Sequence, residues 1–225
     1  MARLCSAGPP RSSPATAAPA GLGGGGGPRI LRRVTDAFAL PPERDRLPTL
    51  EGARVRLRAP READAAAVFG VYSDPRVLRY WSHGPWTDTA QADDWIARSW
   101  TGFAERAFLQ WVVARVEDDA VIGSTTLFAC RAQHRRCEIG YSLAAAHWGR
   151  GYAREALALA LAEAFGTLRL HRVEADIDPR NLASIRLVEA LGFRHEGTLR
   201  ARYHVGGEVQ DSAIYGLLAS DRAPA

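Results

Sequence analysis

The chain has 225 residues and contains no lysine, so all 29 residues counted as lysine or arginine are arginines. Mechanisms that need an ammonium group or an imine-forming amine on the protein are therefore excluded, among them a Walker-type phosphate loop and a Schiff-base enzyme. Cysteine is also scarce. Cys5, Cys130 and Cys137 are too few for a disulfide framework, which is typical of a reduced, intracellular protein, and we expect a cytoplasmic location.

Metal ligands and long apolar runs are scarce as well. Cys130, His134 and Cys137 are clustered, but no fourth ligand follows nearby, so we predict no metal site. The longest uninterrupted apolar run, residues 156–162, has seven residues, whereas a membrane span needs roughly 20. The sequence therefore predicts neither a metal nor a membrane partner.

Charge and composition divide the chain into two parts. Residues 1–33 hold five arginines and no acid, whereas residues 34–225 carry 24 arginines against 25 aspartates and glutamates. The larger part lacks the net basic charge of a nucleic-acid-binding domain, so we expect no nucleic-acid partner. Residues 1–48 hold 8 of the 13 prolines and a run of five glycines, which predicts a disordered Pro/Gly/Ala-rich tail. One folded domain is expected over residues 49–222.

From Leu50 onward the spacing of apolar residues becomes regular. Alternation predicts strands over residues 54–58, 110–115, 120–129, 136–143, 172–178, 198–204 and 209–217. A period near 3.6 predicts helices over residues 60–72, 88–100, 150–165 and 182–191. Gly192 is expected to end the last helix in a left-handed conformation. Hairpins followed by a strand-helix-strand unit predict an α/β fold with a mixed, mostly antiparallel twisted sheet and flanking helices.

The turn Gly149-Arg150-Gly151 lies between a predicted strand and the start of a predicted helix. Free backbone N–H groups and the positive end of the helix meet at such a turn, which favours an anion site. The dinucleotide-binding fingerprint is not matched, because Arg154 stands where its third glycine is required. A glycine-rich helix start that binds no ligand fits the same residues equally well.

Further motifs downstream make the pattern more specific. Asn181-x2-Ser184 is followed by Gly192-Phe193, Glu196-Gly197 and Asp211-x3-Tyr215, and Glu138-Ile139-Gly140-Tyr141 precedes the glycine turn. Together these motifs resemble the GNAT superfamily of N-acetyltransferases, and specifically its branch similar to ribosomal-protein N-terminal acetyltransferases. The resemblance covers about residues 50–220, and it implies the GNAT fold and acetyl-coenzyme A as the cofactor.

The resemblance also implies which residues bind this cofactor. The pantetheine arm would pair with the backbone of Tyr141, Ser142 and Leu143, and would contact Asn181. Ser184 would lie near the sulfur. The pyrophosphate would be held by the backbone amides of Gly149, Arg150, Gly151, Tyr152, Ala153 and Arg154.

Acetyl transfer needs a neutral amine, a polarised carbonyl and a proton for the leaving thiolate. We expect the Ser184 hydroxyl to serve the sulfur; a serine that hydrogen-bonds its own helix backbone is the alternative. Glu138 is the first candidate for the general base and, with Ser184, makes up the predicted catalytic pair. Asp176 and Tyr203 are lesser candidates for the base, and a water relay without a single base stays open.

Five of the six tryptophans fall within residues 81–111. We expect Trp81 and Trp86, which flank a loop, to line the acceptor cleft. Trp95, Trp100 and Trp111 are expected to pack in the core.

The sequence thus predicts an acetyl-coenzyme-A-dependent N-acetyltransferase, a monomer or homodimer. It would transfer the acetyl group directly to a primary amine, on a protein N-terminus or a small molecule. Two alternatives belong to other classes of protein. One is a non-catalytic acyl-coenzyme-A-binding sensor on the same fold, and the other is a partner-binding protein that acts through its basic tail.

Overall fold

The computed structural model describes residues 45–222. The predicted tail, residues 1–48, lies outside this range except for its last four residues. Of these, Leu47 packs against the core, and the Pro48 carbonyl accepts a hydrogen bond from the Trp111 indole nitrogen at 2.8 Å. The expected start of the domain at residue 49 stays a prediction.

Eight strands form one sheet in the order β1-β2-β3-β4-β5-β6-β8-β7. The strands are β1 (Leu50–Glu51), β2 (Val55–Arg58), β3 (Leu109–Arg115), β4 (Val121–Arg131), β5 (Arg136–Leu143), β6 (Arg172–Ile177), β7 (Arg194–Val205) and β8 (Glu208–Leu218). All neighbouring pairs are antiparallel except β5 and β6, which run parallel. The prediction of a mixed, mostly antiparallel sheet is confirmed.

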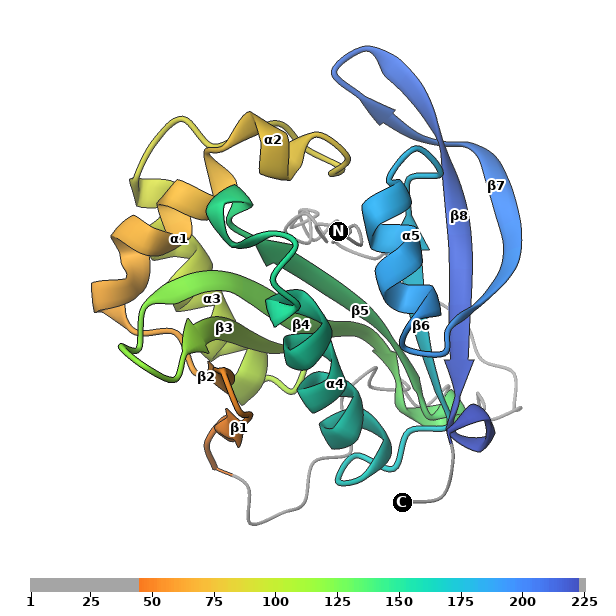
Figure 1. The fold of residues 1–225 in the computed structure, drawn as a ribbon, viewed down its shortest axis with the longest axis horizontal. Coiled ribbons are helices and arrows are strands. Elements are labelled where there is room, and N and C mark those ends of the chain that lie inside the picture. Colours follow the sequence, from red (N-terminus) through yellow and green to blue (C-terminus); the bar gives the residue numbers. More distant parts are fainter. Residues whose placement is uncertain (1–44, 223–225) are drawn as a thin grey trace, which may run out of the picture.

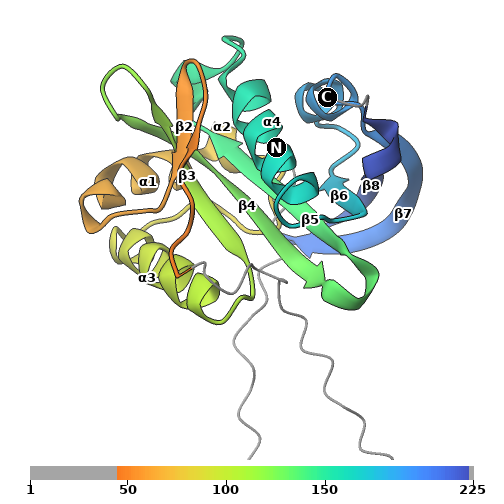
Figure 2. The ribbon, with the colours of Figure 1, turned by 90° about the horizontal axis from the view of Figure 1, so that it is seen from below.

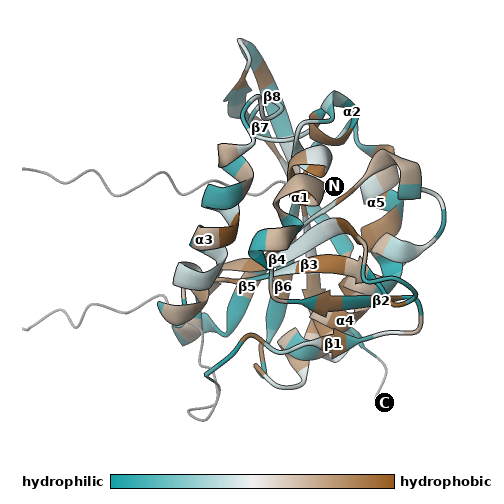
Figure 3. Ribbon diagram, turned by 90° about the vertical axis from the view of Figure 1, so that its left-hand side faces the viewer, coloured by the Kyte–Doolittle hydropathy of each residue, from teal (hydrophilic) through white to brown (hydrophobic). Residues whose placement is uncertain are grey.

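Five α-helices flank the sheet in the described part of the chain: α1 (Ala65–Tyr72), α2 (Pro75–Leu78), α3 (Ala90–Ala104), α4 (Tyr152–Phe165) and α5 (Leu182–Glu189). Short 3₁₀ turns cover Glu62–Asp64, Ala132–His134, Ala145–His147 and Ala219–Asp221. Helices α4 and α5 lie on one face of the sheet, and α3 lies on the other (Figure 2). Helix α3 carries hydrophilic and hydrophobic residues along its length (Figure 3), as expected of a helix with one buried side.

The core consists of two apolar clusters, one on each face of the sheet. The cluster under α4 and α5 contains Leu157 and Leu161 of α4 together with Ile139 and Tyr141 of β5. The cluster under α1 and α3 is built on aromatic residues, and Val112 of β3 joins it from the sheet. Because successive side chains of a strand point to opposite faces, β3 contributes to both clusters, with Trp111 and Val113 on one side and Val112 on the other.

Strands β5 and β6 separate at a defined position. Their ladder consists of the pairs Arg136–Arg172, Cys137–Val173 and Glu138–Glu174, although both strands continue beyond it. Figure 1 shows the two strands moving apart, with α4 and α5 on either side of the opening. The backbone of β5 after Glu138 therefore has no strand partner on its β6 side. Such an edge can pair with an extended ligand.

The predicted elements are present, with differences at their ends. Strand β7 begins at Arg194 rather than at residue 198, because two register shifts and a left-handed Ala201 (φ 53°) interrupt the alternation that marks a strand. Helix α2 was not predicted, although Asp74 caps it and Pro75 occupies its first position. Gly192 is left-handed as predicted, with φ 93°, but α5 already ends at Glu189, two residues before the predicted end at residue 191.

Candidate active site

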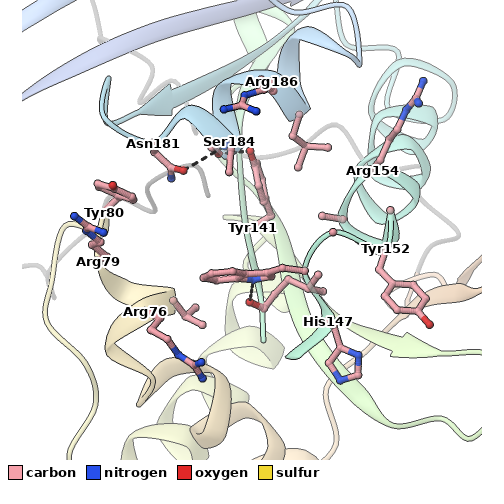
Figure 4. Close-up of a pocket in the computed structure, with 18 residues that line it drawn as sticks. Arg76, Arg79, Tyr80, Tyr141, His147, Tyr152, Arg154, Asn181, Ser184 and Arg186 are labelled. Atoms are coloured by element: carbon pink, nitrogen blue, oxygen red, sulfur yellow. Dashed lines mark hydrogen bonds between the residues drawn. The ribbon is translucent and has the colours of Figure 1, made fainter. Parts of the chain in front are cut away.

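A cavity of about 650 Å³ is lined by residues on both sides of the opening between β5 and β6. Tyr141 and Leu143 line it from β5, and Asn181 and Ser184 from the start of α5. The turn before α4 and the segment around α2 complete the wall, as Figure 4 shows. The structure therefore brings most of the predicted cofactor-binding residues around one cavity.

The turn before α4 has the geometry of an anion site. Gly149 and Gly151 have φ values of 72° and 80°, a left-handed conformation that favours glycine. The first amides of α4, those of Tyr152, Ala153 and Arg154, precede the hydrogen bond from the Glu155 amide to the Gly151 carbonyl. As first-turn amides they have no partner within the helix and remain available to an anion.

Arg54, the residue before β2, holds this turn in place, a role that the sequence did not suggest. Its guanidinium donates to the Arg150 carbonyl at 2.9 Å and to Glu155 Oε2 at 2.9 Å. Glu155 Oε1 accepts from the Arg54 amide at 2.7 Å and from the Val55 amide at 3.3 Å. Burial acts to raise the pKa of Glu155, but these hydrogen bonds and the Arg54 charge outweigh it and lower that pKa. A β-carbon at Gly151 would lie 3.1 Å from an Arg54 nitrogen, which leaves little room for a side chain.

Arginines surround much of the cavity. Arg154 and Arg186 line it from α4 and α5, and Arg76 and Arg79 line it from α2 and the residue that follows it. Guanidinium groups suit phosphate oxygens, because their planar fork can donate two parallel hydrogen bonds. The charge at the cavity therefore favours a phosphorylated ligand.

Two hydroxyl groups meet inside the cavity. The Asn181 side chain caps α5 by accepting from the Ser184 amide at 3.2 Å, which places Ser184 in the first turn of the helix. The Tyr141 hydroxyl and Ser184 Oγ share a short hydrogen bond, drawn in Figure 4. Both residues are at least 97% buried. Burial raises the pKa of the Tyr141 phenol, against a smaller opposing effect of the bond to Ser184, so Tyr141 is protonated at neutral pH.

Trp148 spans another part of the cavity. Its indole nitrogen donates to the Leu143 carbonyl at 2.7 Å, and its side chain is 44% exposed. A carbonyl oxygen has two lone pairs, so Leu143 can accept a second hydrogen bond from a ligand. Trp148 therefore positions a backbone group of β5 that the resemblance assigns to the pantetheine arm.

Glu138 lies on the other face of the sheet. It is the last residue of β5 that pairs with β6, and Tyr141, three residues later, points to the side of α4 and α5. Glu138 Oε2 is buried and makes no hydrogen bond to any residue between 45 and 222. Burial raises the pKa of Glu138, and the carboxylates of Asp176 and Glu174 raise it further, against smaller effects of Arg202 and Arg136. The structure thus separates the two predicted catalytic residues to opposite faces.

The lesser candidates for the base are bound to each other. The Tyr203 hydroxyl donates to Asp176 Oδ2 at 2.7 Å, and the Ser212 hydroxyl donates to Asp176 Oδ1 at 2.6 Å. The Arg202 guanidinium lies 3.2 Å from the same carboxylate. The Asp176 carboxylate therefore already has three partners, whereas Glu138 Oε2 has no hydrogen-bond partner among residues 45–222.

The prediction that Trp81 and Trp86 line the acceptor cleft is wrong. Their side chains are 1% and 9% exposed and pack with Tyr72 in the cluster under α1 and α3, where Trp86 stacks on the Tyr72 ring. Trp95 and Trp111 are buried as predicted, whereas Trp100 is 45% exposed and donates to the Pro60 carbonyl. The prediction from the loop position was wrong because both side chains cover the apolar surfaces of α1 and α3.

Two of the predicted cofactor-binding residues, Ser142 and Arg150, do not line the cavity. The Ser142 side chain points to the opposite face, where it hydrogen-bonds Ser124 at 3.0 Å, and Arg150 contributes its carbonyl to Arg54. Tyr80 and the arginines of the α2 region line the cavity but were missed, because α2 was not predicted. The Asp74-Pro75 cap was the available signal for them.

Within residues 45–222, no group of three or more histidine, cysteine, aspartate or glutamate side chains is arranged to hold a metal ion. Cys130 and Cys137 are both buried in the core. None of the helices in the same range is both long enough and apolar enough to cross a lipid bilayer.

Comparison with known proteins gives consistent results. The family model described as "Acetyltransferase (GNAT) domain" matches residues 54–194. N-acetyltransferase p20 of Bacillus licheniformis is 34% identical over 175 residues, which is 78% of this chain and 98% of that protein. Spermidine N(1)-acetyltransferase of Vibrio cholerae is 27% identical over 71% of this chain and 90% of its own length. The solved structure of Mycobacterium smegmatis RimJ in complex with CoA-disulfide superposes with a TM-score of 0.69 at 25% identity, covering 76% of this chain and 85% of that one.

Proposed function

The chain belongs to the GNAT acetyltransferase family and is an acyltransferase of the N-acetyltransferase class, and from this premise we propose that it transfers the acetyl group of acetyl-coenzyme A directly to a primary amine. The observation that carries the proposal is the cavity at the divergence of β5 and β6. It combines an unpaired strand edge, an anion-binding helix start and two buried hydroxyl groups.

The cavity fits coenzyme A in three respects. The free edge of β5 at Tyr141, Ser142 and Leu143 offers backbone groups to the amides of a pantetheine arm. The turn from Gly149 to Arg154 offers amides to a pyrophosphate. Asn181 and Ser184 line the cavity at the start of α5. The volume, about 650 Å³, lies in the range of small-molecule sites.

Bound acetyl-coenzyme A supplies an activated acetyl thioester: the amine nitrogen forms a bond to the acyl carbon, the C–S bond breaks, and sulfur leaves with the electron pair as a thiolate. Ser184 is the proposed donor to that sulfur. Glu138 is the proposed acceptor of the proton that the amine loses, directly or through water. Its raised pKa brings a carboxylate closer to the pKa of an effective base at neutral pH.

The acceptor is proposed to approach from the face that carries Glu138. Glu174 and Asp176 of β6 lie on this face but are paired with Arg136, Arg172 and Arg202, whereas Glu138 Oε2 has no hydrogen-bond partner among residues 45–222. Glu138 is therefore the carboxylate proposed to meet the amine. Relatives of this chain include spermidine acetyltransferases from Vibrio cholerae and Escherichia coli. Polyamines are therefore the first acceptors to test, with peptides that have a free N-terminus as the second class.

The test measures both cofactor binding and turnover. Thermal melting with acetyl-coenzyme A measures binding, and release of free thiol in the presence of spermidine, spermine or N-terminal peptides measures transfer. We expect a rise in melting temperature and thiol release that depends on the acceptor. Acetylated product is then identified by mass.

Two results would contradict the proposal. A rise in melting temperature without thiol release from any amine would favour the acyl-coenzyme-A sensor. No rise at millimolar cofactor would reject the cavity as a coenzyme A site.

A further inference from the structure

The hydrogen bond between Tyr141 and Ser184 joins two side chains that are far apart in the sequence. Tyr141 belongs to β5 and Ser184 to the first turn of α5, and the two residues line the same cavity. In Figure 4 the Tyr141 ring extends from its strand so that its hydroxyl meets Ser184. This side-chain contact is separate from the backbone role proposed for Tyr141.

The direction of this hydrogen bond follows from the burial of Tyr141. A buried phenol O–H needs an acceptor, because an unsatisfied buried donor is costly. Among residues 45–222, Ser184 Oγ is the one atom to which the Tyr141 hydroxyl is hydrogen-bonded. Tyr141 therefore donates and Ser184 accepts. The Ser184 proton must then point away from Tyr141.

We propose that Tyr141 is a positioning residue for the transfer reaction: by donating to Ser184 Oγ, it fixes the Ser184 hydroxyl so that the serine proton is presented to the departing sulfur. This inference rests on the proposed function. Tyr141 itself transfers no proton in this scheme, and its contribution is the orientation of the donor. Because burial keeps its phenol protonated, the orientation persists across the neutral pH range.

The same kind of pair occurs elsewhere in the protein and provides a matched control. The Tyr72 hydroxyl lies 2.7 Å from Ser124 Oγ, and both residues are buried on the opposite face of the sheet. Neither residue lines the cavity. Tyr72→Phe removes a buried phenol hydroxyl from a serine partner, as Tyr141→Phe does, but leaves the lining of the cavity and the Ser184 hydroxyl unchanged.

The experiment measures kcat and KM for acetyl-coenzyme A, with the acceptor saturating, in wild type, Tyr141→Phe, Ser184→Ala, the double variant and Tyr72→Phe. We expect Tyr141→Phe to lower kcat about tenfold, on the order of one net hydrogen bond, with little change in KM. The double variant should be no slower than Ser184→Ala, because Tyr141 acts only through Ser184. Tyr72→Phe should lower the melting temperature to a similar extent and keep wild-type kcat.

The outcomes separate this inference from the proposed function. If wild type transfers no acetyl group to any amine, the proposed function fails and the inference fails with it. If wild type is active and Tyr141→Phe keeps its kcat, only the role of Tyr141 is overturned. A rise in KM alone would make Tyr141 a cofactor contact instead. If the fold-decrease in kcat of the double variant equals the product of the two single decreases, Tyr141 acts independently of Ser184. This result would also overturn the inference.

Discussion

Strand β5 presents two different surfaces. Toward α4 and α5 it shows Tyr141, whose hydroxyl meets Ser184 in a cavity that arginines surround. Toward the other face it shows Glu138, whose carboxylate lies near those of Glu174 and Asp176. In the proposed reaction, one surface binds the phosphorylated cofactor and stabilises the leaving thiolate, and the other accepts the proton of the amine. A single strand can present both groups because alternate side chains point to opposite faces.

Gly151→Asp should have the largest effect on the cavity side. Acetyl-coenzyme A at 100 times its dissociation constant should stabilise wild type by about 2.7 kcal/mol. The substitution should abolish this stabilisation, because it adds bulk and a negative charge where amides meet phosphate. Gly151→Asn adds the bulk alone and should lose less. Thermal melts with and without cofactor measure both.

Gly206→Asp is the control for the strain of a side chain at positive φ. Gly206 has φ 57° in the β7–β8 turn, with open space around its β-carbon position. The Gly206→Asp variant should keep the full stabilisation by acetyl-coenzyme A. An unchanged response in Gly151→Asp would place the phosphates elsewhere.

Ser184→Ala should lower kcat by about 10² to 10³, the usual cost of one positioned donor, with cofactor affinity little changed. The alternative, a serine bonded to its helix backbone, predicts a loss of about 0.5–1.5 kcal/mol in stability with turnover preserved. Ser99→Ala is the matched control, because the buried Ser99 hydroxyl donates to the Ile96 carbonyl within α3. Single-turnover rates and thermal melts separate the two explanations, and wild-type rates in Ser184→Ala would contradict a catalytic role.

Glu138→Gln should reduce kcat on the order of 10²-fold and leave cofactor binding intact, which would show that the two faces act separately. In wild type kcat should rise with pH through the raised pKa of Glu138, because only the carboxylate accepts a proton. In Glu138→Gln, kcat should no longer rise with pH over this range. An unchanged profile would favour a water relay without this base.

Glu138→Gln should also increase the free energy of unfolding at neutral pH. The folded state holds the Glu138 proton more tightly than the unfolded state, because its pKa is raised on folding. Stability therefore falls as pH rises from the unfolded pKa to the folded one, and the penalty is complete above both. Glu174→Gln should instead lower stability, because Glu174 is paired with Arg136 at 2.8 Å and Arg172 at 2.7 Å. Melting temperatures of both variants at pH 4 and pH 8 test this contrast.

Arg54→Ala should have a smaller effect, a rise of about two- to fivefold in KM for acetyl-coenzyme A. Arg54 is half exposed, and an exposed ion pair contributes about 0.2–1 kcal/mol. Arg115→Ala removes a comparable arginine, paired with Glu117 and Asp118 in the β3–β4 turn, and should leave KM unchanged. Equal KM values in both variants would mean that cofactor binding at the turn before α4 does not depend on Arg54.

Truncation should have the smallest effect. A chain that begins at Asp45 should melt like the full chain, because the composition of residues 1–44 predicts little apolar burial. Removing residues 45–48 as well should lower stability, because the packing of Leu47 and the hydrogen bond from Trp111 to Pro48 are lost. A large drop in the first truncation would contradict the expected domain boundary.

The sequence predicted the fold well because the elements follow local rules. Strand β5 matches its predicted range, and α4 begins two residues late only because Gly151 still belongs to the turn. Local rules also marked the anion turn. They failed for Trp81 and Trp86, because the burial of a loop residue depends on helices that are distant in the sequence.

The sequence alone determined which chemical groups are present: no lysine, a glycine turn before a helix, a serine in the first turn of another helix and a glutamate on a strand. These follow from residue type and near neighbours. Only the tertiary structure decided that Tyr141 meets Ser184, that Arg54 braces the turn, and that Glu138 lies on the opposite face. Those relations depend on the register at which β5 and β6 pair and then separate, which is set by contacts between segments distant in the chain.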